Sequence, residues 1–208
     1  MNFCKQPNNF MDNTHMTTKP KILAFAGSTR TESYNKKLLK TSVSGARAAG
    51  AEVTYLDLRD IPMPLFDEDL EARDGFHPNV RKLKDVMLAS QGLLIASPEY
   101  NGSISGVLKN AIDWVSRPDT GEAPGACFVD KVAAIMSASP SPIGGQRGLV
   151  HTQTILENLK VTVLSDQVSI PKAYDAFNAE GTLKNADQQA AVENLGSTLT
   201  TALLKLKE

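Results

Sequence analysis

The sequence predicts a single α/β domain in which one parallel β-sheet lies between two layers of helices. Five short apolar segments alternate with segments of roughly 12 or more residues whose apolar positions repeat at helical spacing, which is the pattern of successive βαβ units. Several of the short segments are apolar throughout, as is typical of parallel strands buried on both faces. The 208-residue chain is 41% hydrophobic and 22% charged, an ordinary composition for a globular domain with a sizeable core.

The first βαβ unit lies within residues 20–58. An apolar run at 22–26 predicts the first strand. Residues 34–49 place leucine, valine and alanine side chains on one helical stripe, and Gly50 is the residue type that commonly ends a helix. The run at 52–58 predicts the second strand.

The middle of the chain continues this alternation. Residues 59–76 contain two prolines and several acidic residues, so we expect a loop there. A helix at 77–90 and an apolar strand at 92–96 follow. The next helix spans 104–115, and we expect its Trp114 to lie in the core.

The last third of the chain completes the sheet. Residues 131–136 predict the fourth strand and residues 145–159 the fourth helix. Two apolar segments, 161–164 and 167–170, are separated by polar residues, so we expect one interrupted fifth strand. A long final helix spans 184–206.

Charge and composition exclude several classes of function. The net charge of −1 gives no general attraction to nucleic acid or to an anionic membrane. Cys4 and Cys127 are too few for a disulfide scaffold or a four-cysteine zinc site, and the three histidines form no metal-binding pair. Residues 1–19 are polar and lack the apolar core of a secretion signal, and no apolar run is long enough to span a membrane. We therefore expect a flexible N-terminal extension, a domain at 20–208 and a cytoplasmic location.

Right-handed crossovers leave few ways to arrange five parallel strands. The pattern fits the flavodoxin-like three-layer sandwich, with strand order 2-1-3-4-5, and it also fits half of a dinucleotide-binding fold. In both folds, ligands bind beyond the carboxyl ends of the strands, where the strand order reverses. The loops after the first, third and fourth strands are therefore the candidate site.

The first loop, from Gly27 to Asn35, is rich in hydroxyl groups and leads into a helix. Backbone N–H groups at the start of a helix attract anions. The hydroxyls of Ser28 and Ser33 add donors, and Arg30 adds a fixed positive charge. This combination suits a phosphomonoester. The alternative is that Ser33 or Asn35 only caps the helix.

Two common nucleotide-binding motifs are absent from this loop. It contains a single glycine, so there is no G-x-G-x-x-G, and the sequence has no G-x-x-x-x-G-K-[ST]. Asp57 stands where a dinucleotide fold would bind a ribose. Without the glycines, we expect Asp57 to be a solvated acid at the end of its strand.

The second loop, residues 97–106, contains a tight turn. Pro98 fixes the chain as it leaves the strand, and Asn101 and Gly102 form a strong turn pair. Such a turn can present backbone groups to the edge of a planar heterocycle, with Tyr100 near its face; the alternative is that Tyr100 is a packed surface aromatic. A near match to the serine-hydrolase motif G-x-S-x-G has isoleucine at its centre, which disfavours that class.

The third loop, residues 137–148, is rich in serine, proline and glycine. Small residues allow the backbone to approach a flat ligand closely. The alternative is an ordinary connector between strand and helix.

Four segments carry a resemblance to a known family: GSTRTESYN at 27–35, SPEYNGS at 97–103, LKNAIDW at 108–114 and SASP at 137–140, the last followed by two glycines. Over roughly residues 20–190, the chain resembles the NADPH-dependent FMN reductases, a flavodoxin-like family that includes quinone, chromate and azo-dye reductases. One departure is Ser105, where the family usually has proline, and we expect a looser start to the helix there.

The resemblance implies an FMN site built from the three loops. The first loop would hold the phosphate, the second would line the isoalloxazine with a backbone N–H near its N5, and the third would approach the ring from the other side. The residues assigned to FMN in this way are Ser28, Arg30, Ser33, Tyr34, Asn35, Pro98, Glu99, Tyr100, Asn101, Gly102, Ser137, Ser139, Gly144 and Gly145.

The implied activity is transfer of hydride from NADPH, or from NADH, to FMN and then of electrons to a small-molecule acceptor. Because the cofactor performs this chemistry, we assign no catalytic side chain and no metal ligand. The resemblance also implies a homodimer or homotetramer with the flavin near the interface. The alternative is a flavodoxin-type electron carrier without nicotinamide turnover, although such carriers are usually strongly acidic and this chain is not.

Overall fold

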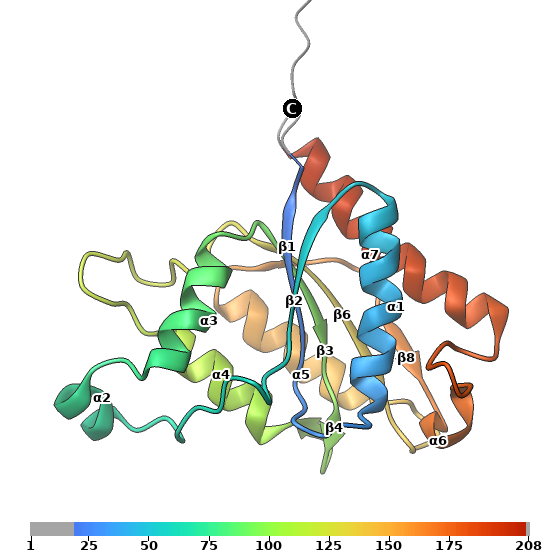
Figure 1. Cartoon of the computed structure of the whole chain (residues 1–208), viewed down its shortest axis with the longest axis horizontal. Helices are drawn as coiled ribbons and strands as arrows, with labels where there is room; N and C mark the ends of the chain where they lie inside the picture. The colour runs from blue at the N-terminus through green and yellow to red at the C-terminus, as the bar shows by residue number, and fades with distance from the viewer. Residues whose placement is uncertain (1–18, 207–208) are drawn as a thin grey trace, which may run out of the picture.

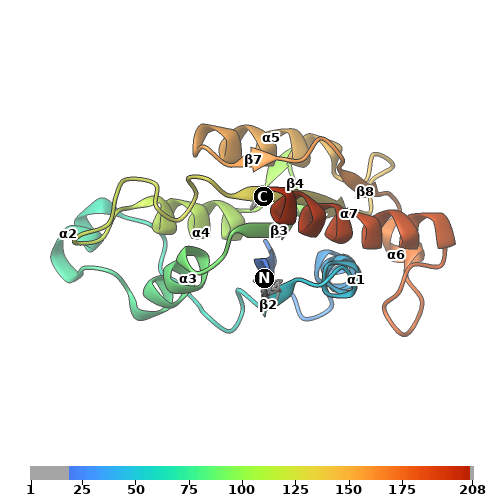
Figure 2. The same ribbon diagram turned by 90° about the horizontal axis from the view of Figure 1, so that it is seen from above.

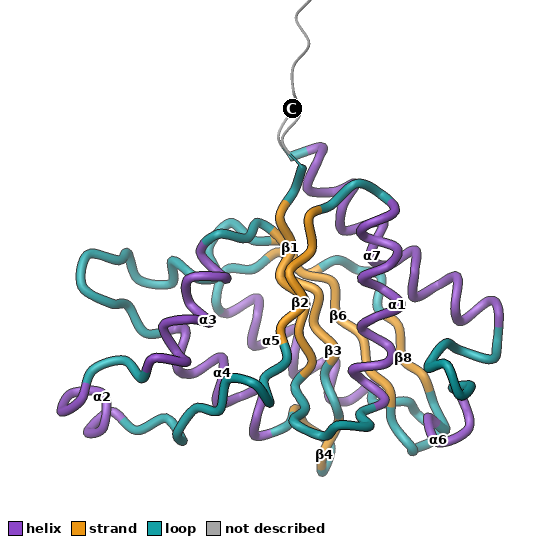
Figure 3. Tube along the Cα trace, viewed as in Figure 1, coloured by secondary structure: helices purple, strands orange, loops and turns teal. Residues whose placement is uncertain are grey.

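The computed structural model describes residues 19–206, so the predicted extension at 1–19 lies outside the described residues except for its last one. Strands occupy the centre of the molecule and helices lie on both sides (Figure 1, Figure 3). In chain order the elements are β1 Lys21–Ala26, α1 Tyr34–Ala48, β2 Glu52–Leu56, α2 Glu68–Asp74, α3 Pro78–Leu88, β3 Gly92–Ala96, β4 Glu99–Tyr100, β5 Ser103–Ile104, α4 Gly106–Ser116, β6 Val132–Ala138, α5 Gln146–Asn158, β7 Thr162–Val163, β8 Val168–Ile170, α6 Ala173–Ala176 and α7 Ala186–Lys205.

The main sheet is parallel and has the order β2-β1-β3-β6-β7. The short strand β8 also pairs with β6, beyond the point where β7 ends. The pieces β7 and β8 together form the interrupted fifth strand that the sequence predicted. The flavodoxin-like order 2-1-3-4-5 is therefore confirmed.

Alternate residues of the central strands face two separate hydrophobic cores. In β1, Ile22 and Ala24 face α1 and α7, whereas Leu23 and Phe25 face α3, α4 and α5. The view from above shows α1 and α7 together on one side of the sheet and α3 and α4 on the other (Figure 2). Helices α1 and α7 approach each other closely because Gly196 has no side chain: a Cβ there would lie 2.0 Å from the carbonyl oxygen of Ser42. Within residues 19–206, no helix is both long and apolar enough to cross a membrane.

The predicted loop at 59–76 was wrong in one respect, because it contains helix α2. This helix buries none of its residues, so it has no apolar stripe for sequence periodicity to detect. Its start is stabilised by Asp67, whose carboxylate accepts a hydrogen bond from the Asp69 N–H at 2.9 Å. Ion pairs from Arg117 to Glu71 and Glu68 hold it against the end of α4.

The predicted turn at Asn101 and Gly102 is confirmed. Both residues have positive φ, 53° and 78°, and they connect the short antiparallel strands β4 and β5. Positive φ at two successive positions is the geometry that Asn-Gly adopts most readily in a hairpin.

The prediction for Trp114 is also confirmed. The side chain is fully buried, its ring lies edge-on to Phe66, and its Nε1–H donates to the Pro64 carbonyl at 2.8 Å. Asn110 donates to the same carbonyl at 2.9 Å. The LKNAIDW helix therefore fixes the loop that follows β2.

Strands β1, β3 and β6 are parallel, so their carboxyl ends lie at one edge of the sheet, at the lower end of the molecule in Figure 1. Helix α7 ends at the opposite edge. The three candidate loops are therefore neighbours in space.

Candidate functional site

The three loops meet around one small cavity of about 90 Å³. It has a hydroxyl-rich wall from the first loop, an aromatic rim from the second and a serine–proline wall from the third. The lining residues are Ser28, Arg30, Ser33, Tyr34, Asn35, Pro98, Glu99, Tyr100, Ala138, Ser139 and Pro140. Sequence reasoning had assigned all of them to the site except Ala138 and Pro140, which flank the assigned Ser139.

Ser105 fixes the beginning of the first loop. Its hydroxyl donates to the Gly27 carbonyl at 2.6 Å, and its oxygen accepts from the Leu108 N–H at 3.1 Å. The second bond caps α4, so the expectation of a looser helix start was wrong. A serine at this position replaces the rigidity of proline with a side-chain cap and adds a bond between two of the loops.

Arg30 is held over an aromatic stack. Its guanidinium carbon lies 5.9 Å from the centre of the Tyr34 ring, and Tyr34 stacks on Phe177 at 6.0 Å with an interplanar angle of 8°. Among residues 19–206, no carboxylate lies within ion-pair distance of Arg30. Its charge is therefore available to an anion. Phe177 follows the last strand, and nothing in the sequence indicated that it lies beside the first loop.

The start of α1 leaves several donors for a ligand. Ser33 occupies the N-cap position, but its hydroxyl makes no capping hydrogen bond, and the first turn contains no acidic residue. In the loop just before the helix, the N–H groups of Thr29, Thr31 and Glu32 donate to no other described residue, although these three residues do not line the cavity. Ser28 is buried, and its oxygen accepts from the Arg30 N–H at 3.3 Å. A helix start with free N–H groups, hydroxyls and an unpaired arginine is a suitable environment for a phosphate.

Asn35 lies in the cavity wall but its amide is already bonded. The Nδ2–H donates to the Ala138 carbonyl at 2.8 Å, and Oδ1 accepts from the Ala138 N–H at 3.0 Å. The residue is only 4% exposed. Asn35 thus joins α1 to the end of β6 and positions both walls of the cavity.

The second loop contributes Pro98, Glu99 and Tyr100 to the cavity. The Glu99 carboxylate accepts from the Gly148 N–H at 2.9 Å, so it caps α5 from a distant part of the chain. Tyr100 is 52% exposed at the rim. The turn residues Asn101 and Gly102 lie outside the cavity lining.

In the third loop, Ser139 lines the cavity, whereas Ser137, Gly144 and Gly145 do not. Both glycines have positive φ, 64° and 93°. A Cβ on Gly145 would lie 2.0 Å from the Ser137 hydroxyl oxygen, and one on Gly144 would lie 2.9 Å from the backbone of Ile170. Packing within the protein therefore already requires small residues here.

The expectation that Asp57 is simply solvated was wrong. Its carboxylate forms an ion pair with Lys36 at 2.6 Å, and its side chain is only 22% exposed. The pair joins the end of β2 to the first turn of α1.

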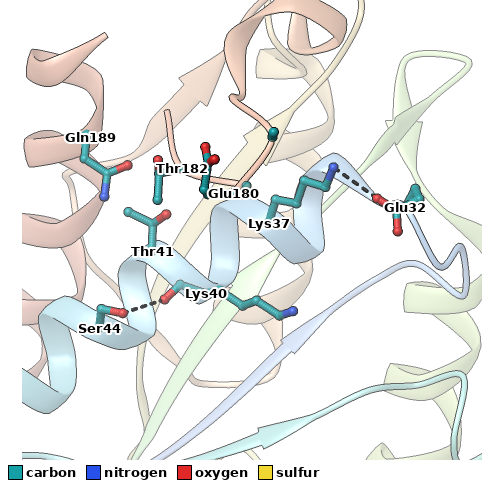
Figure 4. A pocket seen from close by; sticks show the side chains of 10 residues that line it. Glu32, Lys37, Lys40, Thr41, Ser44, Glu180, Thr182 and Gln189 are labelled. Carbon is teal, nitrogen blue, oxygen red and sulfur yellow. Dashed lines mark hydrogen bonds and ion pairs between the residues drawn. The ribbon is translucent and has the colours of Figure 1, made fainter. Parts of the chain in front are cut away.

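A larger polar groove of about 350 Å³ lies along α1 (Figure 4). Its polar groups bond mainly to each other and to the backbone: Lys37 pairs with Glu32 at 3.1 Å, and Gln189 accepts from the Leu183 N–H at 3.0 Å. None of the residues that the sequence assigned to the site lines this groove.

Comparison with known proteins shows the family to which the chain belongs. The profile of the NADPH-dependent FMN reductase family matches residues 20–175, which contain all three loops. An NAD(P)H-dependent FMN reductase of Pseudomonas aeruginosa is 40% identical over 169 residues, covering 81% of this chain and 86% of that protein. A quinone reductase of Escherichia coli is 33% identical over 150 residues, covering 72% of this chain and 76% of that protein.

A solved structure has a similar fold. The flavoenzyme NAD(P)H:(acceptor) oxidoreductase FerB from Paracoccus denitrificans superposes with a TM-score of 0.69 and is 26% identical, covering 88% of this chain and 96% of that one.

Proposed function

Because the chain belongs to the NADPH-dependent FMN reductase family, we propose that it uses FMN to transfer hydride from NAD(P)H, and then electrons to a small acceptor. The acceptor classes are a quinone, free flavin, an azo compound or chromate. The observation that carries the proposal is the convergence of the three predicted loops on one cavity at the carboxyl edge of the sheet.

The first loop is suited to hold the FMN phosphate. Free N–H groups in the loop before α1 and the Ser28 and Ser33 hydroxyls supply donors, and Arg30 supplies a positive charge. Tyr34 orients Arg30 through their cation–π contact. Asn35 acts as a positioning residue because its amide is bonded to Ala138.

The second and third loops are suited to bracket a flat ring. Pro98, Glu99 and Tyr100 form one wall, and Tyr100 is exposed beside it. Ser139 and Pro140 form the other wall. In the proposed complex, Asn101 and Gly102 approach the ring edge through their backbone, and Ser137, Gly144 and Gly145 support the third loop from behind.

When bound, FMN would supply the redox chemistry, as the acceptor of hydride from the nicotinamide. The protein orients the rings, excludes water from the buried side and offers N–H donors to negative charge on the flavin. Location in the cytoplasm and assembly into a homodimer or homotetramer remain predictions.

The deciding measurement is an absorbance spectrum of the purified protein, with FMN added where needed, before and after anaerobic addition of NADPH and then NADH. We expect flavin bands that bleach within seconds. Flavin bands that persist would identify a flavodoxin-type electron carrier instead. No retention of FMN would refute the assignment of the loops.

The phosphate assignment has its own test in the double variant Ser28→Ala, Arg30→Ala. We expect weaker retention of FMN, because one hydroxyl donor and the unpaired charge are lost. Full flavin occupancy in the double variant would show that the phosphate binds elsewhere.

A further inference from the structure

Lys36 is in an unusual position for a lysine. It lies in the first turn of α1, where a positive charge opposes the helix dipole, and its side chain is only 7% exposed. Burying an ammonium group is unfavourable unless it is paired. Its partner is Asp57, at 2.6 Å from the end of β2.

Both oxygens of Asp57 are used. Oδ2 accepts from Lys36, and Oδ1 accepts from the Arg59 N–H at 2.9 Å. The Arg59 guanidinium in turn donates to the Thr31 hydroxyl, within the first loop. Together, these bonds connect Lys36 in α1 to Asp57 and Arg59 after β2, and from there to Thr31 in the first loop.

The opposite side of the same loop is held separately. Asn35 bonds to Ala138 at the end of β6, and Ser105 bonds to Gly27 where the loop begins. The loop is therefore fixed from β6, from α4 and, through the Lys36 ion pair, from β2. Of these three connections, the one to β2 is the one built from charged side chains.

We infer that Lys36, Asp57, Arg59 and Thr31 form a positioning network that sets the first loop for the phosphate of FMN. This rests on the proposed function, since it concerns the same site. The side chains of the four residues act by holding the loop backbone and are assigned no contact with the flavin.

Comparing FMN with riboflavin isolates this role. Riboflavin has the same ring and ribityl chain but no phosphate, so the difference between the two dissociation constants reports the phosphate site alone. Both constants are measured on the apoprotein by quenching of flavin fluorescence, a readout that does not depend on turnover.

The two substitutions Asp57→Asn and Lys36→Met distinguish geometry from charge. Either change breaks the network, and we expect each to raise the dissociation constant of FMN about tenfold, as for loss of one hydrogen bond to a charged group, with riboflavin almost unchanged. If only charge mattered, Asp57→Asn would leave Lys36 unpaired near the phosphate and would tighten FMN binding. Tighter binding by this variant would overturn the inference.

Lys37→Met is the matched control. It removes the same charge from the next residue of α1, which pairs with Glu32 (Figure 4). This pair is more exposed than that of Lys36, with side chains 29% and 76% accessible. Surface pairs of this kind contribute little. We expect less than about a twofold change for either flavin; an effect equal to that of Lys36→Met would overturn the inference.

Arg59→Gln provides a variant at the surface that should fold even if the buried pair is essential for stability. We expect a smaller loss of affinity, still confined to FMN. If the dissociation constant of FMN is unchanged, or if FMN and riboflavin are weakened equally, the network only stabilises the fold in general. Either result would overturn the inference. Failure of the unaltered protein to bind either flavin would instead refute the proposed function.

Discussion

The Asn35 side chain holds together two elements that are far apart in the sequence, and Asn35→Ala measures how much this bond contributes. The substitution leaves the Ala138 N–H and C=O without the partners now at 3.0 and 2.8 Å. Leaving a buried backbone group unpaired costs about 1–3 kcal/mol. For two groups beside a residue that is 4% exposed, we expect the free energy of unfolding to fall by about 3 kcal/mol.

The assay is urea denaturation of the apoprotein, followed by circular dichroism and by the fluorescence of the single tryptophan, the buried Trp114. Asn194→Ala is the control, because Asn194 is an exposed amide on α7. We expect that change to alter stability by less than about 0.5 kcal/mol.

A loss below about 1 kcal/mol for Asn35→Ala would refute this reasoning. If that small loss came with a large fall in FMN affinity, Asn35 would contact the phosphate directly. A stability loss of the expected size shows that its first role is to join α1 to β6.

Two further predictions concern packing and pH. In thermal or urea unfolding, Gly145→Ala should destabilise the protein by at least about 2 kcal/mol more than Gly50→Ala. Both glycines have positive φ, but only the methyl group added at Gly145 would meet another atom, at 2.0 Å. Equal losses of stability in the two variants would contradict this prediction. Burial raises the pKa of the Glu122 carboxyl, but hydrogen bonds from Lys84, a backbone N–H and Arg81 outweigh it, and the pKa falls from 4.5 to about 2. The stability that this lowered pKa contributes is present above the unfolded pKa and is lost as pH drops from about 5 towards 2. In urea titrations, the stability of Glu122→Gln should therefore depend less on acid pH than that of the unaltered protein. Identical pH profiles would exclude this carboxyl as a cause of the loss of stability in acid.

The order of the strands was predictable because β1, β3 and β6 are apolar on both faces. These apolar runs can be recognised in the sequence without knowing which strands pair with them. Short elements were harder to predict. Helix α2 has no buried residue, and β4 and β5 have two residues each. Their presence depends on capping and on a turn, not on periodicity.

The position of the site was predictable from topology, whereas the tasks of individual residues were not. The family resemblance assigned Asn35 and Glu99 to the FMN site. In the structure their polar groups bind backbone of β6 and α5. Such bonds join residues far apart in the sequence, and no local pattern indicates them. The pairing of Lys36 with Asp57 was missed for the same reason.

The cavity draws its walls from the beginning, the middle and the later part of the chain, and this has a consequence for biosynthesis. Strand β1 is first in the chain and lies between β2 and β3 in the sheet, so both of its neighbours are translated after it, and Ala138, the partner of Asn35, is translated later still. Phe177, which supports the stack beneath Arg30, leaves the ribosome after all five strands. A nascent chain therefore carries its phosphate loop long before that loop has a fixed shape. We expect flavin loading to await almost complete translation, so that truncated products do not compete for the cofactor.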